Sequence, residues 1–105
     1  MNQLTTKRVL RRIKREFSPE KPTLWVGKNG LTPDLIEEAQ RQLESREVVK
    51  LRLHRTVPQS AEEMARGLAN QTRGEIVEVR GRSFILYKPL KRDWKEEENP
   101  GKEES

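Results

Sequence analysis

The spacing of apolar residues predicts a first helix over residues 6–17, with Thr5 or Thr6 as its cap. Its apolar stripe recurs at helical intervals and consists of Leu10, Ile13 and Phe17. The sequence SPEKP follows and ends the helix, because proline cannot continue it. The other face is strongly basic and carries Lys7, Arg8, Arg11, Arg12, Lys14 and Arg15. Like charges at this spacing repel one another unless a counterion is present. A solvated surface is one interpretation of this face, and contact with an anionic partner is the other and the favoured one.

Two further helices are predicted from capping signals and apolar stripes. Thr32 is a good N-cap and Pro33 suits the first helical position, so a helix starts at about residue 33 and fades near residue 47. Its buried stripe consists of Leu35, Ile36, Ala39 and Leu43. Ser60 and Glu63 form a capping box for a third helix, which we expect to stop at Gly74. The apolar stripe of that helix is Ala61, Met64, Ala65 and Leu68.

Short apolar and alternating runs predict four strands. TLWVG, at residues 23–27, is typical of a buried strand, so we expect Trp25 to lie in the core. VVKLRLHR, at residues 48–55, alternates cleanly and predicts a half-buried strand. Its inner face would hold Val49, Leu51 and Leu53, and its outer, basic face Val48, Lys50, Arg52 and His54. EIVEVR and SFILYK flank Gly81 and Arg82, a two-residue loop typical of a type II′ hairpin.

The order of these elements, α-β-α-β-α-β-β, predicts an α+β fold with a four-stranded mixed sheet and helices packed on it. The first two strands flank a helix and should therefore be parallel. At 105 residues the chain fits one compact domain, which we place at residues 1–90. Residues 91–105 are charged and have almost no apolar side chains, so we expect a disordered tail there.

The charge of the chain is uneven along its length. Lys and Arg outnumber Asp and Glu by 22 to 17, which gives a net charge of +5. Residues 1–30 carry eight basic and two acidic side chains, whereas residues 91–105 carry four basic and six acidic ones. A basic front with an acidic tail predicts polyanion binding.

Several classes of function lose support from the composition. Without cysteine the chain has no disulfides, thiolate metal sites or cysteine nucleophiles, and His54 alone cannot form a histidine-pair metal site. Glu37 and Glu38 point about 100° apart on their helix, so we interpret them as structural rather than as an acid–base pair. No apolar run is long enough to span a membrane. We therefore expect a cytoplasmic, monomeric protein that is not an enzyme. We expect it to bind no cofactor or small-molecule substrate and not to associate with a membrane.

The motif VGKNGLTP, at residues 26–33, places two glycines around a lysine and an asparagine just before a helix start. A plain strand-to-helix turn is one interpretation of Gly27, Lys28, Asn29 and Gly30. The other is a phosphate-binding loop, in which backbone N–H groups bind the phosphate and glycine lets an RNA backbone come close.

Two segments resemble the CRM domain, the chloroplast RNA splicing and ribosome maturation module. VGKNGLTPDLIEEAQRQLESREVVKLRL is similar to its strand, GxxG loop, helix and strand, and GRSFILYKP is similar to its closing strand. The resemblance covers residues 6–90 and implies a fold similar to the C-terminal domain of bacterial translation initiation factor three. It also implies RNA binding without catalysis, on precursors of the large ribosomal subunit in bacterial relatives and in intron splicing in plant relatives. By position, it places the GxxG loop at residues 27–30 and a basic surface beside it on the first helix.

The charge pattern and the motif predict binding of RNA through the GKNG loop and the basic helix, and the resemblance implies that this RNA is structured, ribosomal precursor RNA. Lys50 and Arg52 are weaker candidates for RNA contact, since they could instead pair with nearby glutamates. The rival hypothesis is a protein-interaction adaptor on a ribosomal or RNA-processing complex, whose basic face meets an acidic protein patch.

Overall fold

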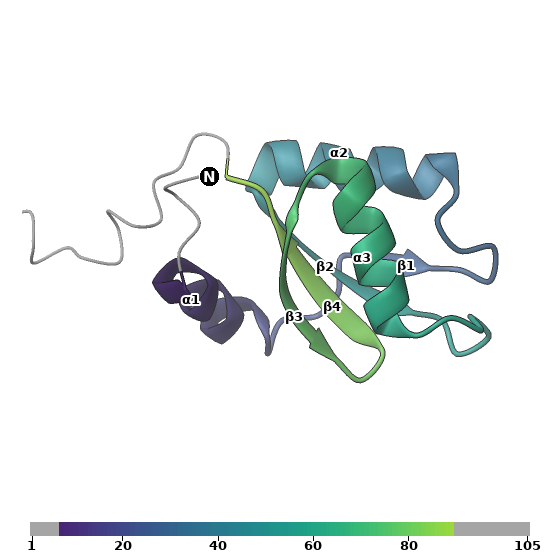
Figure 1. Ribbon diagram of the computed structural model, residues 1–105, viewed down its shortest axis with the longest axis horizontal. Coiled ribbons are helices and arrows are strands. Elements are labelled where there is room, and N and C mark those ends of the chain that lie inside the picture. The colour runs from purple at the N-terminus through teal and green to yellow at the C-terminus, as the bar shows by residue number, and fades with distance from the viewer. Residues whose placement is uncertain (1–6, 90–105) are drawn as a thin grey trace, which may run out of the picture.

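The computed structural model describes residues 7–89 of the chain. They form, in order, α1 (Lys7–Phe17), β1 (Leu24–Val26), α2 (Pro33–Arg46), β2 (Val48–Leu53), α3 (Ala61–Thr72), β3 (Glu75–Arg80) and β4 (Ser83–Tyr87) (Figure 1). The predicted order α-β-α-β-α-β-β is confirmed. The predicted threonine cap of the first helix and the tail at residues 91–105 lie outside the described residues, so the domain boundary at residue 90 stays a prediction.

The helix starts follow the capping signals in the sequence. Thr32 Oγ1 accepts a hydrogen bond from the Leu35 N–H at 3.2 Å. The capping box at the start of α3 is reciprocal, since Ser60 Oγ accepts from the Glu63 N–H at 3.1 Å and Glu63 Oε1 accepts from the Ser60 N–H at 2.9 Å. Both helices therefore begin where the sequence predicts.

The end of α3 differs in detail from the prediction. The left-handed cap residue is Arg73, with φ 64°, and not Gly74, which follows it. Gly74 is needed for a different reason: a Cβ there would lie 3.3 Å from Thr72 Oγ1 and 3.5 Å from the Tyr87 carbonyl oxygen. Glycine at this position thus allows the chain to pass close to β4 rather than to adopt a left-handed conformation.

The four strands form one mixed sheet in the order β1-β2-β4-β3. β1 is parallel to β2, and β4 is antiparallel to both of its neighbours. The hairpin is confirmed, because Arg80 pairs with Ser83 across a two-residue loop in which Gly81 has φ +59°. Glycine is favoured at a first loop position with positive φ, as in a type II′ turn.

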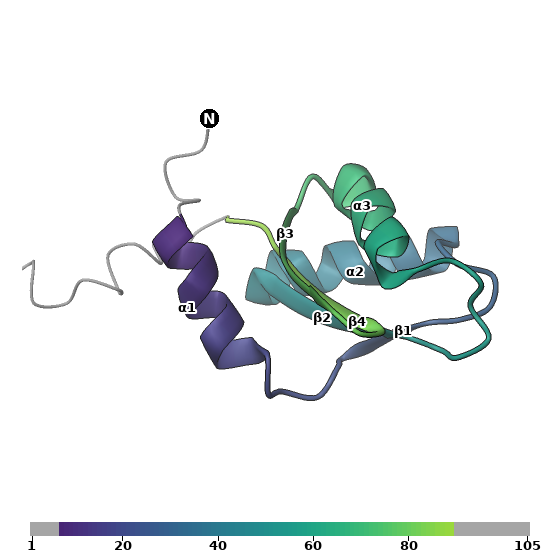
Figure 2. The same ribbon diagram turned by 60° about the horizontal axis from the view of Figure 1, so that its bottom comes forward.

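The main core lies on one face of the sheet, under α2 and α3 (Figure 2). Fully buried side chains from the sheet and both helices meet there, among them Val26, Leu43, Leu51, Leu53, Ala65 and Leu68. The predicted stripes of α2 and α3 supply most of the helical side of this core, apart from Ile36, which is only partly buried. This layer of two helices on a sheet holds the β1–α2 connection in place.

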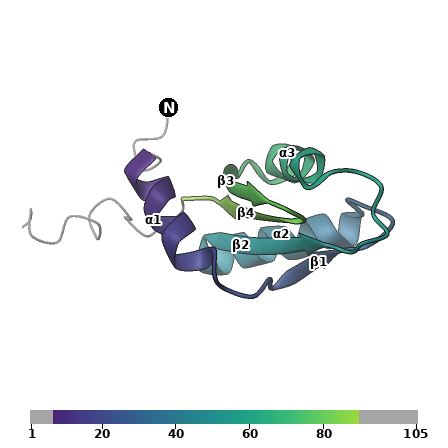
Figure 3. The same ribbon diagram turned by 90° about the horizontal axis from the view of Figure 1, so that it is seen from below.

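A second, smaller core lies on the opposite face of the sheet, under α1 (Figure 3). It consists of Val9, Ile13, Val48, Ile85 and Tyr87, bordered by Leu10, Phe17 and Val77. The predicted stripe of α1 is therefore rotated, because its buried residues are Val9 and Ile13. Val48 lies on the same face of β2 as Lys50 and Arg52, as predicted, but it is only 4% exposed because α1 covers it.

Candidate nucleic-acid interface

Residues 27–30 form a closed turn between β1 and α2. The Gly30 N–H donates to the Gly27 carbonyl at 2.9 Å, and the Thr32 N–H donates to the Gly30 carbonyl at 3.0 Å. Lys28 and Asn29 occupy the two central positions of the turn, and both are exposed. The GKNG turn thus presents its lysine and asparagine to solvent directly before the N-terminus of α2.

The two glycines of this turn have different structural roles. Gly30 is buried and has φ +74°, a conformation that other residues adopt only with strain. Gly27 is exposed, its φ is not positive, and a Cβ built on it would have no atom within 4 Å. The fold therefore requires glycine at position 30. It does not require glycine at position 27, where the space outside the turn is open.

Two backbone N–H groups of the turn are available to a ligand. The N–H groups of Lys28 and Asn29 donate to no group in the described part of the protein. Neighbouring amides in a turn that precedes a helix form a concave donor surface suited to an anion, and the helix dipole adds to it. The positive side chain of Lys28 lies beside these donors, so the turn has the groups that a phosphate requires.

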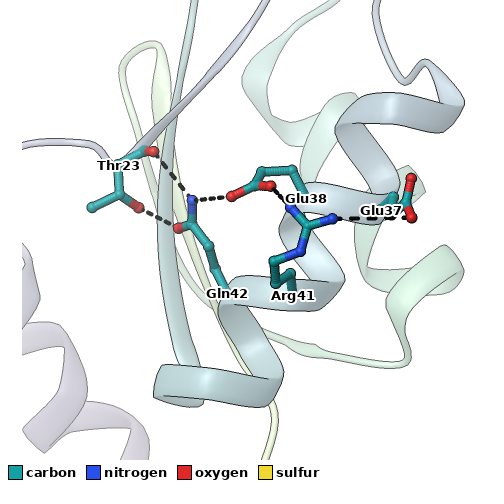
Figure 4. A network of polar contacts seen from close by, with 5 residues as sticks. All are labelled: Thr23, Glu37, Glu38, Arg41 and Gln42. Atoms are coloured by element: carbon teal, nitrogen blue, oxygen red, sulfur yellow. Dashed lines mark hydrogen bonds and ion pairs between the residues drawn. The ribbon is translucent and has the colours of Figure 1, made fainter.

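A polar network joins the residue before β1 to α2 (Figure 4). Thr23 Oγ1 donates to Gln42 Oε1 at 2.6 Å, and Gln42 Nε2 donates to the Thr23 carbonyl at 3.3 Å and to Glu38 Oε2 at 3.2 Å. Arg41 completes the network through ion pairs with Glu38 and Glu37. Both glutamates thus make ion pairs within α2, in agreement with their interpretation as structural residues.

The outer face of α1 is basic, as the sequence predicts. Its exposed cations are Lys7, Arg8, Arg11, Lys14 and Arg15. Arg12 is less exposed and pairs with Glu16 at 3.1 Å, one turn later on the helix. Since Val9 and Ile13 anchor the opposite side of α1 to the sheet, the exposed cations point away from the domain.

The GKNG turn and the basic helix lie at opposite ends of the sheet, so the prediction that they are adjacent is wrong. α1 packs on Val48, the first residue of β2, whereas the turn follows Val26, which pairs with Leu53 at the end of β2. Figures 1 to 3 all place α1 at one end of the domain and the β1–α2 connection at the other. The reason is that the β1–α2 connection leaves from the far end of β1, and α1 docks at the near end.

The two weaker candidates on β2 differ from each other. Lys50 Nζ donates to three main-chain carbonyls at the end of α1 and just after it, those of Phe17 at 3.3 Å, Ser18 at 2.5 Å and Glu20 at 2.8 Å. Its ammonium group therefore caps the C-terminus of α1. Arg52 is exposed, and its guanidinium lies 3.4 Å from Ser83 Oγ. Of the two, Arg52 is the one with a surface position open to a ligand.

Trp25 was expected to lie in the core and is instead 54% exposed. Its neighbours Leu24 and Val26 face the main core, so Trp25 must face the other side of this three-residue strand. The alternation of inner and outer positions along β1 would have identified this. Tyr87, in contrast, is fully buried under α1.

The described residues contain no group of three or more His, Cys, Asp or Glu placed to hold a metal ion. No helix among residues 7–89 has the length and hydrophobicity required to cross a membrane.

Known proteins with a similar sequence or fold were found. The chain is 29% identical, over 70 residues, to the probable RNA-binding protein YqeI of Bacillus subtilis (strain 168), a match that covers 67% of this chain and 73% of YqeI. The solution structure of SAV1595 from Staphylococcus aureus, a hypothetical protein named as a candidate for RNA binding, superposes with a TM-score of 0.67. That match has 28% sequence identity and covers 89% of this chain and 94% of SAV1595.

The sequence pattern of one family covers nearly the whole described region. The CRS1 / YhbY (CRM) domain matches residues 4–88, which include α1, the GKNG turn and the four strands. The observed element order and sheet agree with the fold that the resemblance implied. The chain therefore belongs to the CRS1/YhbY (CRM) domain family.

Proposed function

We propose that this protein binds RNA and that the GKNG turn holds an RNA backbone. The observation that carries the proposal is the exposed turn itself, in which Gly27 leaves open space beside the unpaired N–H groups of Lys28 and Asn29. A phosphate can approach such a backbone closely, and each N–H donates a charge-assisted hydrogen bond to it. The names of YqeI and SAV1595 and the family match support this function.

The exposed cations of α1 form a second contact with the same RNA. They are separated from the turn by the length of the sheet, so one ligand must span the domain to reach both. Structured RNA is large enough to do so and carries phosphates at both places. We therefore propose that α1 attracts the RNA electrostatically and that the turn makes close contact with the RNA backbone.

The biological setting that we propose is the assembly of the large ribosomal subunit. The resemblance to bacterial CRM proteins supports precursor ribosomal RNA as the ligand and a binding module rather than an enzyme. We further propose that the protein acts in the cytoplasm and as a monomer. Arg52 contributes to the RNA-facing surface, while Lys50 acts by holding α1.

The test is a titration of the protein against structured ribosomal RNA fragments at two salt concentrations. We expect Lys28→Asp with Asn29→Asp to weaken binding strongly, because the turn becomes negative and repels phosphate. We also expect the wild-type affinity to fall steeply with salt, since each neutralised phosphate releases counterions. Lys14→Ala with Arg15→Ala should lower the slope of that dependence by about 0.7–0.9 per lost contact.

The matched control is Arg66→Asp with Asn70→Asp. These residues are exposed on α3, and the pair of substitutions changes the net charge by the same amount as the variant of the turn. Equal losses of RNA affinity in both double variants would show that the overall charge of the protein, and not the turn, controls binding. If purified RNA does not bind at all while an acidic protein partner does, the adaptor hypothesis replaces RNA binding.

A further inference from the structure

The described helices leave uncovered the end of the α1 face of the sheet that lies away from α1, and Trp25, Arg52 and Arg80 are exposed there. α1 packs over Val48 and Tyr87, which pair with each other at one end of the sheet. A row of paired residues crosses all four strands further along, and we call it the cross-sheet row; it consists of Trp25, Arg52, Ser83 and Arg80. Residues paired across a sheet point to the same face, so these four side chains share one surface. The row lies four residues from Val48 along β2, about 13 Å at 3.3 Å per residue.

Trp25 makes no contribution to either core of the domain. Trp25 and Val79 are the large hydrophobic side chains that the described residues expose. β1 is an edge strand, and an exposed aromatic residue on an edge promotes unwanted association. Tryptophan is enriched at binding surfaces, where its large apolar ring contacts a partner. A flat ring lying open on a sheet is suited to stacking against another flat ring.

The side chains around Trp25 are basic. One hollow beside it is lined by Arg52, Leu53, His54, Arg55 and Arg82, and a second, which shares Arg52, includes Arg80 and Ser83. Arg82 is occupied by the carbonyls of His54 and Val57, at 2.7 and 3.2 Å. Arg55 makes no polar contact within the described part of the protein. Glu78 is the one acid that lines either hollow.

We propose that the cross-sheet row binds an unpaired nucleotide, with its base stacked on Trp25 and its phosphates facing Arg52 and Arg55. This inference rests on the proposed function and extends it from the backbone of the RNA to an unpaired base. A nucleotide combines the two properties that the surface complements, a flat aromatic ring and negative charge. The carboxylates of an acidic protein patch would pair with the arginines, but they would not stack on the exposed indole ring.

The row also lies close to the GKNG turn. Trp25 precedes Gly27 by two residues, a distance of about 7 Å along the strand. A nucleotide next to one whose phosphate is held by the turn can therefore reach the sheet. The basic face of α1 lies beyond the other side of the row, so an unpaired segment would connect the two contacts that are otherwise separated.

The test uses a 12-nucleotide oligouridylate and, as a matched probe, an abasic ribose-phosphate oligomer of the same length and charge. The chain has two tryptophans, so Trp94→Phe is introduced first to make Trp25 the only tryptophan fluorophore. We expect oligouridylate to quench the fluorescence of Trp25 and the abasic oligomer to leave it nearly unchanged. Affinities of the variants are read from the fluorescence anisotropy of dye-labelled oligomers. Trp25→Ala should weaken oligouridylate binding by about 5- to 150-fold, the range typical of one stacked base, without weakening the abasic oligomer.

Two further variants separate stacking from loss of fold. Trp25→Phe should retain most of the affinity, because phenylalanine also stacks. Val79→Ala removes the other exposed apolar side chain, from the edge strand β3, and should change nothing. Equal binding of the two oligomers, or unchanged oligouridylate binding by Trp25→Ala, would overturn the proposed base site. If the protein still binds structured RNA through the turn in that case, the proposed function stands; if no RNA binds, both fall.

Discussion

The two faces of the sheet are built differently. The face under α2 and α3 is closed by a large core that includes residues from every strand except β3, with Ile76 of β3 packed at its margin. The face under α1 is closed only at one end, by five buried residues, and exposes a tryptophan and two arginines at the other. Burial on the first face stabilises the domain, and exposure on the second makes the polar and aromatic groups available to a ligand.

This difference also separates the residues that hold the fold from those that we propose to bind RNA. The proposed ligand-binding groups lie on the α1 face or on the turn at its edge, and removing them uncovers no core. Mutations can therefore test the stability of the fold and the binding of RNA separately. For residues under α1, this requires that α1 can open locally while the rest of the protein stays folded.

The largest effect on stability is expected in the main core. Leu68 is fully buried there, and Leu68→Ala should lower the free energy of unfolding by about 2–5 kcal/mol, since a cavity remains under α3. Ile13 is equally buried under α1, but the cost of Ile13→Ala is limited to the free energy that docks this helix. Urea unfolding gives the two free energies, and amide hydrogen exchange shows which elements open.

Hydrogen exchange decides whether the faces are independent. In Ile13→Ala we expect the amides of α1 to lose protection while those of β2 and β4 keep theirs. Equal losses of stability in both variants, with uniform exchange, would instead mean that the two faces unfold as one cooperative unit.

A smaller effect is expected for Lys50, which holds α1 by its last carbonyls rather than by apolar packing. Lys50→Met keeps the length of the side chain but removes the charge and its three hydrogen bonds. Hydrogen bonds to charged groups contribute about 1.5–3 kcal/mol, and partial exposure of Lys50 places the loss at the lower end. The measurement is hydrogen exchange in α1, and Lys88→Met, a half-buried lysine after β4, is the control. Unchanged protection of α1 would show that apolar packing alone docks it.

The sequence predicts the local features of this fold and misses how its layers meet. The helix starts at Thr32 and Ser60 and the loop at Gly81 are set by neighbouring residues, and all three were correct. The exposure of Trp25 and the burial of Val48 depend instead on where α1 docks on the sheet. No short-range pattern encodes that position, because the helix and its contacts on β2 are separated in sequence by the SPEKP connection and all of β1 and α2.

The candidate site shows the same limit. The sequence identified the GKNG turn and the basic helix as separate motifs, but it could not place them at opposite ends of the sheet. It also could not separate Lys50 from Arg52, which are two residues apart on the same face. The first is occupied by carbonyls of the chain after α1, a contact across 30 or more residues that only the folded structure creates.

The smallest effect on stability is expected within the turn itself. One of its two glycines is required by the fold, and the other is proposed to serve RNA binding. Gly30 is buried with positive φ, so Gly30→Ala should cost about 1–2 kcal/mol of stability. Gly27→Ala adds a methyl group in open space and should change stability by less than about 0.5 kcal/mol. Thermal or urea unfolding of both variants measures these costs, and RNA titration of the same samples measures binding.

Gly27→Ala then gives a direct test of close approach by the RNA backbone. If a phosphate lies against the turn, the added methyl group must push it away, and affinity should fall although the fold is intact. Unchanged affinity would mean that the ligand contacts only the side chains of Lys28 and Asn29. The open space beside Gly27 would then have no part in binding, and the turn would differ from the basic helix only in its position on the sheet.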